Sequence, residues 1–158
     1  MVEKCVTVEG GAVDKPQNVI APIGASLEEL FNYCGGLTEE PAKIIYGGPM
    51  MGITVANTDV PVIKNTNAIL ALTEKEAKLP KTTACIRCGA CLNTCPFGLA
   101  PVSIAEAYEK NDVEMLNSLS VLSCMECGCC SFVCPAKRPI VQNNKLAKAA
   151  LRTAKEVK

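Results

Sequence analysis

Short apolar runs separated by turn-forming residues characterise the first half of the chain. Val6 and Val8 alternate with polar neighbours, which is the pattern of a strand that buries one face. Further brief apolar runs occupy residues 19–20, 44–46, 60–63 and 68–72, with Gly, Pro, Asn and Thr between them. Runs of this length with such boundaries predict short β-strands.

One amphipathic helix is predicted among these strands. Ser26 and Glu29 form a capping box, in which each side chain accepts a hydrogen bond from the backbone of the other residue, and apolar residues follow at helical spacing. Gly35 and Gly36 end the helix. Short strands around a single helix favour a small β-grasp-like α+β module, which we assign to residues 1–74.

The pattern changes to helices and loops after this module. Residues 101–110 have the apolar spacing of a helix, and Asn111 can cap a second short helix whose apolar side includes Met115. Residues 140–157 predict a third helix. Its expected buried stripe consists of Leu146, Ala147, Ala150, Leu151 and Ala154. We therefore expect an α-helical domain over residues 75–158, so that the fold class of the whole chain is α+β.

An internal repeat lies within this second half. The segment 84–96 recurs as 123–135, with cysteines, one glycine and one proline in matching positions. The matching cysteines are Cys85, Cys88, Cys91 and Cys95 in the first copy and Cys124, Cys127, Cys130 and Cys134 in the second. Both copies read C-x-x-C-x-x-C-x-x-x-C-P, so any chemistry of the first copy is expected of the second.

This spacing is typical of proteins that bind two 4Fe-4S clusters. Three thiolates from a tight loop cover one side of a cluster, and the last cysteine of each run ligates the other cluster. The predicted ligands of the first cluster are Cys85, Cys88, Cys91 and Cys134. The predicted ligands of the second cluster are Cys124, Cys127, Cys130 and Cys95.

The crossed ligands predict that the two clusters are neighbours. If Cys91 and Cys95 lie on one helix, they are about 6 Å apart along its axis, which sets the clusters on the order of 10 Å from each other. Neighbouring clusters suit the relay of electrons. A purely structural role, in which the clusters only brace the fold, is the weaker alternative.

Zinc sites and disulfides are the competing explanations for so many cysteines. Zinc sites use separated C-x-x-C pairs, often with His, and the chain has no His. Disulfides do not impose one spacing twice, and the chain has 11 cysteines, an odd number. Cys129 takes the position of Ala90 in the first copy, so we expect a small buried residue there. Cys5 and Cys34 are expected in the core or at the edge of the first module.

The balance of charged residues excludes some classes of function but does not indicate one. Sixteen basic and sixteen acidic residues give no electrostatic basis for binding nucleic acid. The sequence shows no signal peptide and no apolar run of the roughly 18 residues needed to span a membrane, so we expect a reducing compartment and no direct membrane span. Arg87, Lys137 and Arg138 flank the cysteine loops, where they either offset cluster charge or are ordinary surface residues.

Several stretches resemble the C subunit of the Rnf complex, the ion-translocating ferredoxin:NAD oxidoreductase. They are residues 46–52 (YGGPMMG), 59–64 (DVPVIK), 67–73 (NAILALT) and 124–141. The resemblance extends over residues 6–152, and the first half resembles the soluble-ligand-binding β-grasp (SLBB) domain of that family. Residues 47–52 also resemble a ligand-contacting loop, although a turn between two strands explains them equally well.

The resemblance implies an electron relay within an Rnf-type complex. Members of the family carry a preceding domain that binds FMN and NADH, and we expect both cofactors only on that domain, which has no counterpart here. The chain should then pass electrons without oxidising NADH by itself. The expected partners are other redox subunits of a membrane-bound complex, which would hold the chain peripherally on the cytoplasmic face.

Two alternatives to the Rnf relay stay open. A related cobalamin reductase of a microcompartment resembles the same family in its domain order. A ligand- or partner-binding module braced by structural clusters belongs to a different class of function. An iron–sulfur protein of the succinate-dehydrogenase type is less favoured, because it needs an upstream C-x₄-C-x₂-C run that Cys5 and Cys34 do not supply.

Overall fold

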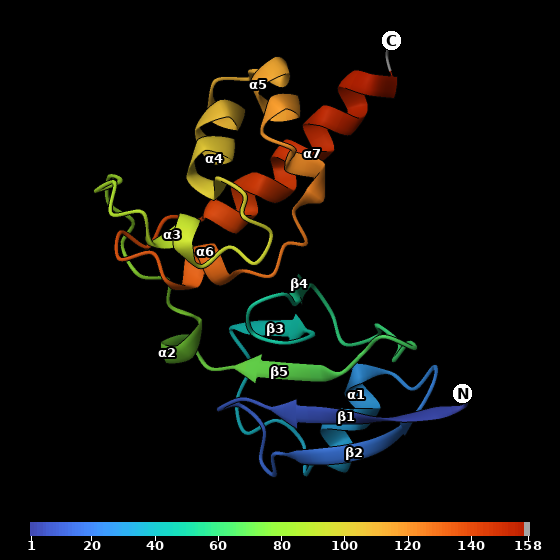
Figure 1. The fold of residues 1–158 in the computed structure, drawn as a ribbon. Coiled ribbons are helices and arrows are strands. Elements are labelled where there is room, and N and C mark those ends of the chain that lie inside the picture. The colour runs from blue at the N-terminus through green and yellow to red at the C-terminus, as the bar shows by residue number, and fades with distance from the viewer. Residues whose placement is uncertain (157–158) are drawn as a thin grey trace. The chain divides into compact units, whose positions relative to one another are not determined.

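In a computed structural model that describes residues 1–156, four of the apolar runs of the first half form one five-stranded sheet together with residues 53–55 (Figure 1). The strands are β1 (Glu3–Glu9), β2 (Gln17–Pro22), β3 (Lys43–Tyr46), β4 (Ile53–Val55) and β5 (Ala68–Leu72). Their order in the sheet is β2-β1-β5-β3-β4. The central strands β1 and β5 pair in parallel, and the other neighbours pair in antiparallel.

The predicted helix of the first half is α1 (Leu27–Tyr33), and it begins with the predicted capping box. The backbone N–H of Glu29 donates to Ser26 Oγ at 3.2 Å, and the backbone N–H of Ser26 donates to Glu29 Oε2 at 2.8 Å. Leu27 and Phe31 are buried against the sheet in one core. Burying side chains of this size contributes roughly 1.5–3 kcal/mol each, which is why α1 stays on the sheet.

One predicted strand is wrong, and one observed strand was not predicted. Residues 60–63 form no strand apart from an isolated bridge between Pro61 and Ser26, because proline has no N–H for a ladder. β4 instead pairs with β3 to form a hairpin. Residues 47–52 connect these two strands, with Gly47 at φ 110°, so the interpretation of this segment as a turn between strands is correct.

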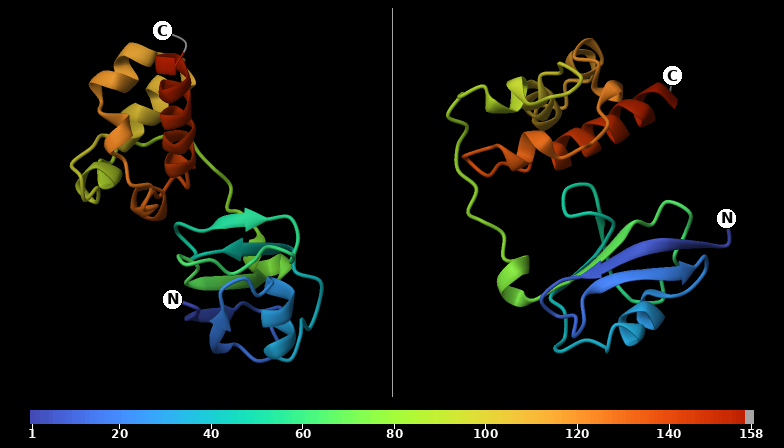
Figure 2. Two further views of the ribbon diagram at one scale, coloured as in Figure 1. Left: turned by 90° about the vertical axis from the view of Figure 1, so that its right-hand side faces the viewer. Right: turned by 60° about the horizontal axis from the view of Figure 1, so that its bottom comes forward.

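The contacts divide the chain after Leu79, and the second of the two units is helical. The short helix α2 (Glu74–Ala77) ends the first unit. The second unit contains α3 (Ala90–Asn93), α4 (Pro101–Glu109), α5 (Val113–Ser118), the 3-10 helix η1 (Val121–Ser123), α6 (Cys129–Phe132) and α7 (Ile140–Glu156). Within this unit α4 and α7 pack along each other, and α3 lies beside α6 (Figure 2).

Two groups of buried residues form the core of the helical unit. The first consists of Ile104, Ala107, Leu116, Val121, Ala147 and Leu151, from α4, α5, η1 and α7. The second consists of Ala105, Cys130, Cys134, Ala136 and Ile140. Two cysteines of the second repeat are therefore part of the core rather than of the surface.

Three details of the predicted helices are wrong. Asp112 rather than Asn111 caps α5, since Asp112 Oδ1 accepts a hydrogen bond from Met115 N at 2.9 Å and Asn111 has a left-handed backbone. Met115 and Leu146 are exposed. The next residues, Leu116 and Ala147, are the buried ones. Successive side chains point about 100° apart around a helix, so Met115 and Leu146 are turned away from the core. The predicted last residue of the third helix, Val157, lies outside the described residues.

The sequence repeat is also a repeat of backbone conformation. Three positions of positive φ recur in matching places: Arg87 with Glu126, Gly89 with Gly128, and Gly98 with Lys137. The turn after each motif is closed by a backbone hydrogen bond of the same length, 3.1 Å. α4 and α7 then begin at matching positions of the two copies. The two loops are thus built alike, including residues whose types differ.

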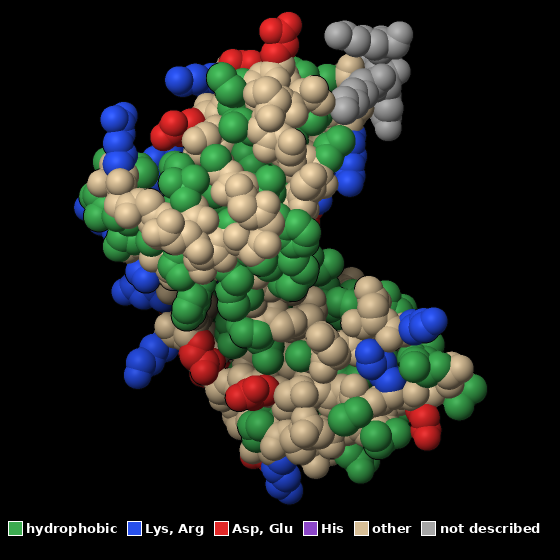
Figure 3. Space-filling model, viewed as in Figure 1, with side chains coloured by type: hydrophobic (Ala, Val, Ile, Leu, Met, Phe, Trp, Pro, Cys, Tyr) green, Lys and Arg blue, Asp and Glu red, His purple; other side chains and the backbone are tan. Residues whose placement is uncertain are grey.

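Charged side chains of both signs are interspersed over the face seen in Figure 3, in keeping with the balanced composition. Among the helices of residues 1–156, none combines the length and the apolar character that a membrane crossing requires.

Candidate metal centre

The first cavity of the helical unit is lined by cysteines of both repeats. Its volume is about 230 Å³, and its walls include Cys85, Cys88 and Cys91 from the first loop and Cys134 from the second. Cys88 is exposed, whereas Cys134 is buried. The cavity therefore opens to solvent on the side of the first loop and is closed on the side of the core.

The second cavity has the complementary set of cysteines. Cys124, Cys127 and Cys130 come from the second loop, and Cys95 comes from the first. Its volume is only about 20 Å³, enough for about one water molecule.

Cys129 gives the second cavity a fifth thiol. It lines the cavity and is half-buried, so the expectation of a buried small residue at this position is only partly met. Hydrogen bonding to the Cys127 side chain, ahead of burial, raises the pKa of Cys129. Its counterpart Ala90 lines the first cavity without contributing a donor.

The path of the chain between the two cavities differs from the predicted helix. α3 ends at Asn93, so Cys91 and Cys95 do not share one helix, and the expectation that they do is wrong. The residue before a proline is disfavoured in the α conformation, and Pro96 follows Cys95 directly. The same rule ends α6 before Cys134.

Burial affects the ionisation of the innermost thiols. It raises the pKa of Cys130 to about 11, and it also raises the pKa of Cys91. Thiolate is the form that binds metal, so metal binding at either cavity must displace protons. One sulfur of the first loop accepts a hydrogen bond from the backbone: the N–H of Arg87 donates to Cys85 Sγ at 3.4 Å.

The donor set fits an iron–sulfur cluster better than a single ion. Among the side chains that the structure describes, no three of His, Cys, Asp or Glu converge closely enough to hold one metal ion. A zinc site needs four donors at about 2.0–2.3 Å from one point. Cysteines spread around a cavity of 230 Å³ suit a larger group whose ligands are thiolates.

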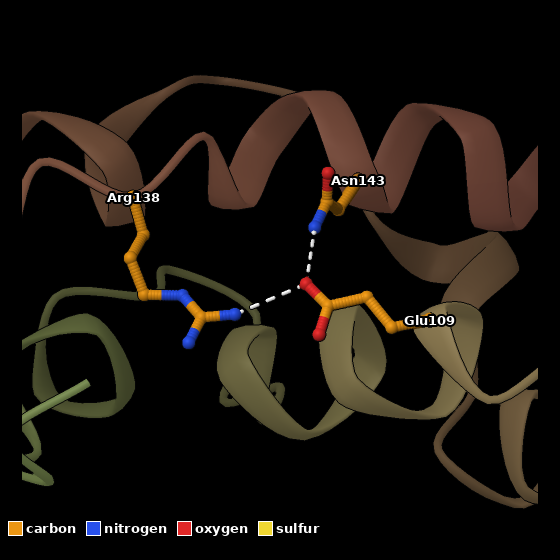
Figure 4. Close-up of polar contacts among 3 residues, drawn as sticks. All are labelled: Glu109, Arg138 and Asn143. Atoms are coloured by element: carbon orange, nitrogen blue, oxygen red, sulfur yellow. Dashed lines mark hydrogen bonds and ion pairs between the residues drawn. The ribbon is translucent and has the colours of Figure 1, made fainter. Parts of the chain in front are cut away.

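The charged residues singled out near the first loop behave differently from one another. Arg87 and Arg138 line the first cavity, whereas Lys137 is exposed and does not. Arg138 donates to Glu109 Oε1 at 3.1 Å, and Asn143 Nδ2 donates to the same oxygen at 3.0 Å (Figure 4). Arg138 therefore lies beside the first cavity, with its positive charge partly offset by the carboxylate of Glu109.

A buried cation at the second loop was missed in the sequence. Lys148 of α7 is 9% exposed, and its Nζ donates to the backbone oxygen of Cys124 at 2.7 Å and to Glu126 Oε1 at 2.6 Å. The signal that could have found it is its spacing. Residues 140, 144, 147, 148 and 151 form one helical stripe, and all of them are buried.

Two domain families match the chain. The SLBB domain family matches residues 5–54, and the 4Fe-4S dicluster domain family matches residues 77–148. The chain is thus an iron–sulfur protein of the two-cluster ferredoxin type with an SLBB domain. The prediction of two 4Fe-4S clusters as its cofactors is confirmed by the dicluster domain.

Curated relatives identify the family more narrowly. The C subunit of the ion-translocating oxidoreductase complex of Rhodobacter capsulatus is 43% identical over 96% of this chain. The C subunit of the proton-translocating ferredoxin:NAD(+) oxidoreductase complex of Clostridium ljungdahlii is 40% identical over 99% of the chain. The C subunit of the Na(+)-translocating complex of Acetobacterium woodii is 41% identical over 94%.

These matches cover 29%, 34% and 33% of the three relatives, so the chain spans about a third of their length. The chain belongs to the family of C subunits of these Rnf-type complexes, and it corresponds to a part of that subunit. The resemblance seen in the sequence is confirmed.

Proposed function

We propose that this chain relays electrons through two 4Fe-4S clusters within an Rnf-type ferredoxin:NAD oxidoreductase. One observation carries the proposal: each cysteine-lined cavity combines three cysteines of one loop with the last cysteine of the other. When bound, such clusters supply one-electron redox chemistry. The short segments 91–95 and 130–134 each join the two cavities, so the chain itself holds the two sites close together.

The ligand sets follow from the cavities and the cysteine spacing. We propose Cys85, Cys88, Cys91 and Cys134 for the first cluster and Cys124, Cys127, Cys130 and Cys95 for the second. The burial of Cys130 and Cys134 supports this assignment, because both thiols end in the core beside a cavity instead of in solvent. Cys129 is the only other cysteine in either lining, and it is left out because it breaks the repeat.

We further propose a division of labour between residues 1–74 and residues 75–158. The first part would be a β-grasp-like module that binds a ligand or partner, a proposal supported by its mixed five-stranded sheet and the single helix α1 packed on it. The second part would hold both clusters. The sites for FMN and NADH would belong to another domain of the same protein, so this part alone would not oxidise NADH.

The proposed partners are other redox subunits of a membrane-bound complex. The relatives are named as subunits of ion-translocating complexes, which supports an assembly of this kind for the present chain. The exposed Cys88 at the mouth of the first cavity supports electron exchange at that loop. In this proposal partner subunits hold the chain at the cytoplasmic face of the membrane.

Anaerobic reconstitution of the chain with iron and sulfide tests the relay. We expect about eight iron atoms per chain, four for each cluster, and the EPR spectrum of two interacting clusters after reduction with dithionite. Cys127→Ala should remove about half of the iron, whereas Cys5→Ala, which changes an exposed residue of β1, should remove none. A preparation that takes up zinc and stays redox-silent contradicts the proposal.

A ligand-binding role braced by structural clusters is the second candidate. A groove of about 350 Å³ between β2 and α1 favours it, with Ile20 and Tyr33 exposed at 62% and 71% in its lining. Cys127→Ala separates the two roles. Loss of electron transfer with partner binding retained supports the relay, and unchanged electron transfer after loss of a cluster supports the bracing role.

A further inference from the structure

Lys148 is a buried cation with two partners, and both belong to the second cysteine loop. Its Nζ lies 2.7 Å from the backbone oxygen of Cys124 and 2.6 Å from Glu126 Oε1. Burying a lysine is costly unless its charge is paired and its donors are used. The carboxylate of Glu126 and the backbone oxygen of Cys124 offset the cost of burying this charge, and both belong to the second loop.

The first loop has no equivalent contact. Arg87 occupies the position that matches Glu126, with the same left-handed backbone, φ 53° against 61°. Arg87 is exposed, and among the described residues it takes part in no ion pair. The same loop position thus carries a free cation in one copy and an anion bound to α7 in the other.

We propose that Lys148 is a positioning residue for the second cluster: it latches the loop 124–127 onto α7 and, together with Glu126, tunes the reduction potential of that cluster. This proposal rests on the proposed ligand set, in which Cys124 and Cys127 bind the second cluster. We call the three groups, Lys148 Nζ, Glu126 Oε1 and the Cys124 oxygen, the Lys148 latch.

The latch acts on the loop in two ways. Its hydrogen bond to the Cys124 oxygen fixes the peptide between Cys124 and Met125, since the peptide unit is planar. Its ion pair with Glu126 ties the side chain of this loop residue to α7. Loss of the lysine therefore loosens the part of the loop that carries two proposed ligands.

The charges of the latch predict opposite effects for its two side chains. Reduction makes a cluster more negative, so a nearby cation raises its potential and a nearby anion lowers it. Lys148→Met leaves Glu126 unpaired and should lower the potential of one couple. Glu126→Gln leaves Lys148 unpaired and should raise the potential of the same couple. A merely structural role does not produce shifts of opposite sign.

An EPR-monitored redox titration of the reconstituted chain, with iron release to a chelator as a second readout, tests the latch. Lys148→Met should release iron from one of its two clusters about tenfold faster, the lower end of the effect seen for groups that orient metal ligands. Lys148→Arg, which keeps the cation, should stay near the wild type. Lys145→Met is the matched control, because it removes the same charge from α7 at a residue with no ion pair among the described residues.

The affected couple should be the one that disappears in Cys95→Ala. If Lys148→Met and Glu126→Gln shift potentials in the same direction, or if Lys148→Met matches Lys145→Met in both readouts, the latch is refuted while the relay stands. If the wild-type chain binds no clusters under these conditions, the proposed function itself fails. Glu126→Gln changes a half-exposed residue, so it tests the latch even if Lys148→Met does not fold.

Discussion

The two cysteine loops have the same backbone but are held to the rest of the helical unit by different contacts. Next to the first loop, Thr83 N donates to Ala136 O at 3.0 Å and Thr82 Oγ1 to Lys137 O at 3.1 Å, both before the first cysteine. The second loop is bound directly by the buried Lys148 of α7. The repeated motif determines the loop conformation, and the side chains outside it determine how open each site is.

The difference extends to the cysteines themselves. At matched positions, Cys88 is exposed where Cys127 is half-buried, and Cys130 is buried where Cys91 is half-buried. The cavities beside the two loops measure about 230 Å³ and about 20 Å³. The first loop is therefore the more exposed of the two.

Replacing the crossed cysteines should have the largest effect. Cys134→Ala is expected to lose the cluster of the first loop, and Cys95→Ala the cluster of the second, because each lines the cavity opposite its own loop. Each variant should retain about four of eight iron atoms, and EPR should show a different surviving cluster in each. If each variant loses the cluster of its own loop, the crossing is wrong.

Alkylation rates of the cysteines in the metal-free chain should also differ between the two loops, although this effect is smaller than the loss of a cluster. Cys88 is exposed and should react with iodoacetamide well before Cys130, whose pKa is raised to about 11 by burial. Thiolate is the reactive form, so the rate at Cys130 should rise as the pH approaches 11, whereas in the range near pH 8 it should be slow. Peptide mass spectrometry after timed quenching measures both rates. Equal rates at pH 8 would show that the second loop is as open as the first.

Local patterns predicted well the parts of the fold that depend on local contacts. The capping box at Ser26 involves residues only three positions apart, and the strand at Val6 and Val8 pairs with the next strand along the chain. The local sequence was therefore enough to predict both. The cysteine repeat likewise predicted two loops with matching turns. Its register also led to the two cysteine sets that line the two cavities.

The features that were missed depend on contacts between distant segments. The partner of Lys148, Glu126, lies in a loop 22 residues earlier in the chain and becomes evident only when α7 is packed against that loop. The strand β4 exists because β3 offers it a ladder, and the run 60–63 fails because Pro61 cannot complete one. The helical spacing of α7 marks Lys148 as buried, but no local pattern identifies the partner of Lys148 or of β4.

The smallest expected effect concerns the turn after each motif, where Gly98 and Lys137 have matching left-handed backbones, φ 61° and 53°. A Cβ at Gly98 meets no atom within 4 Å, so Gly98→Ala tests the backbone alone. It should cost about 1 kcal/mol, a fall in Tm of about 4–8 °C for a unit of this size. Lys137→Gly should raise Tm by less, because glycine gains conformational entropy when the chain unfolds. Calorimetry of the anaerobically loaded chain measures both shifts. Tm shifts in the same direction for both variants would mean that the two turns are not equivalent. The structural repeat would then be limited to the cysteine loops themselves.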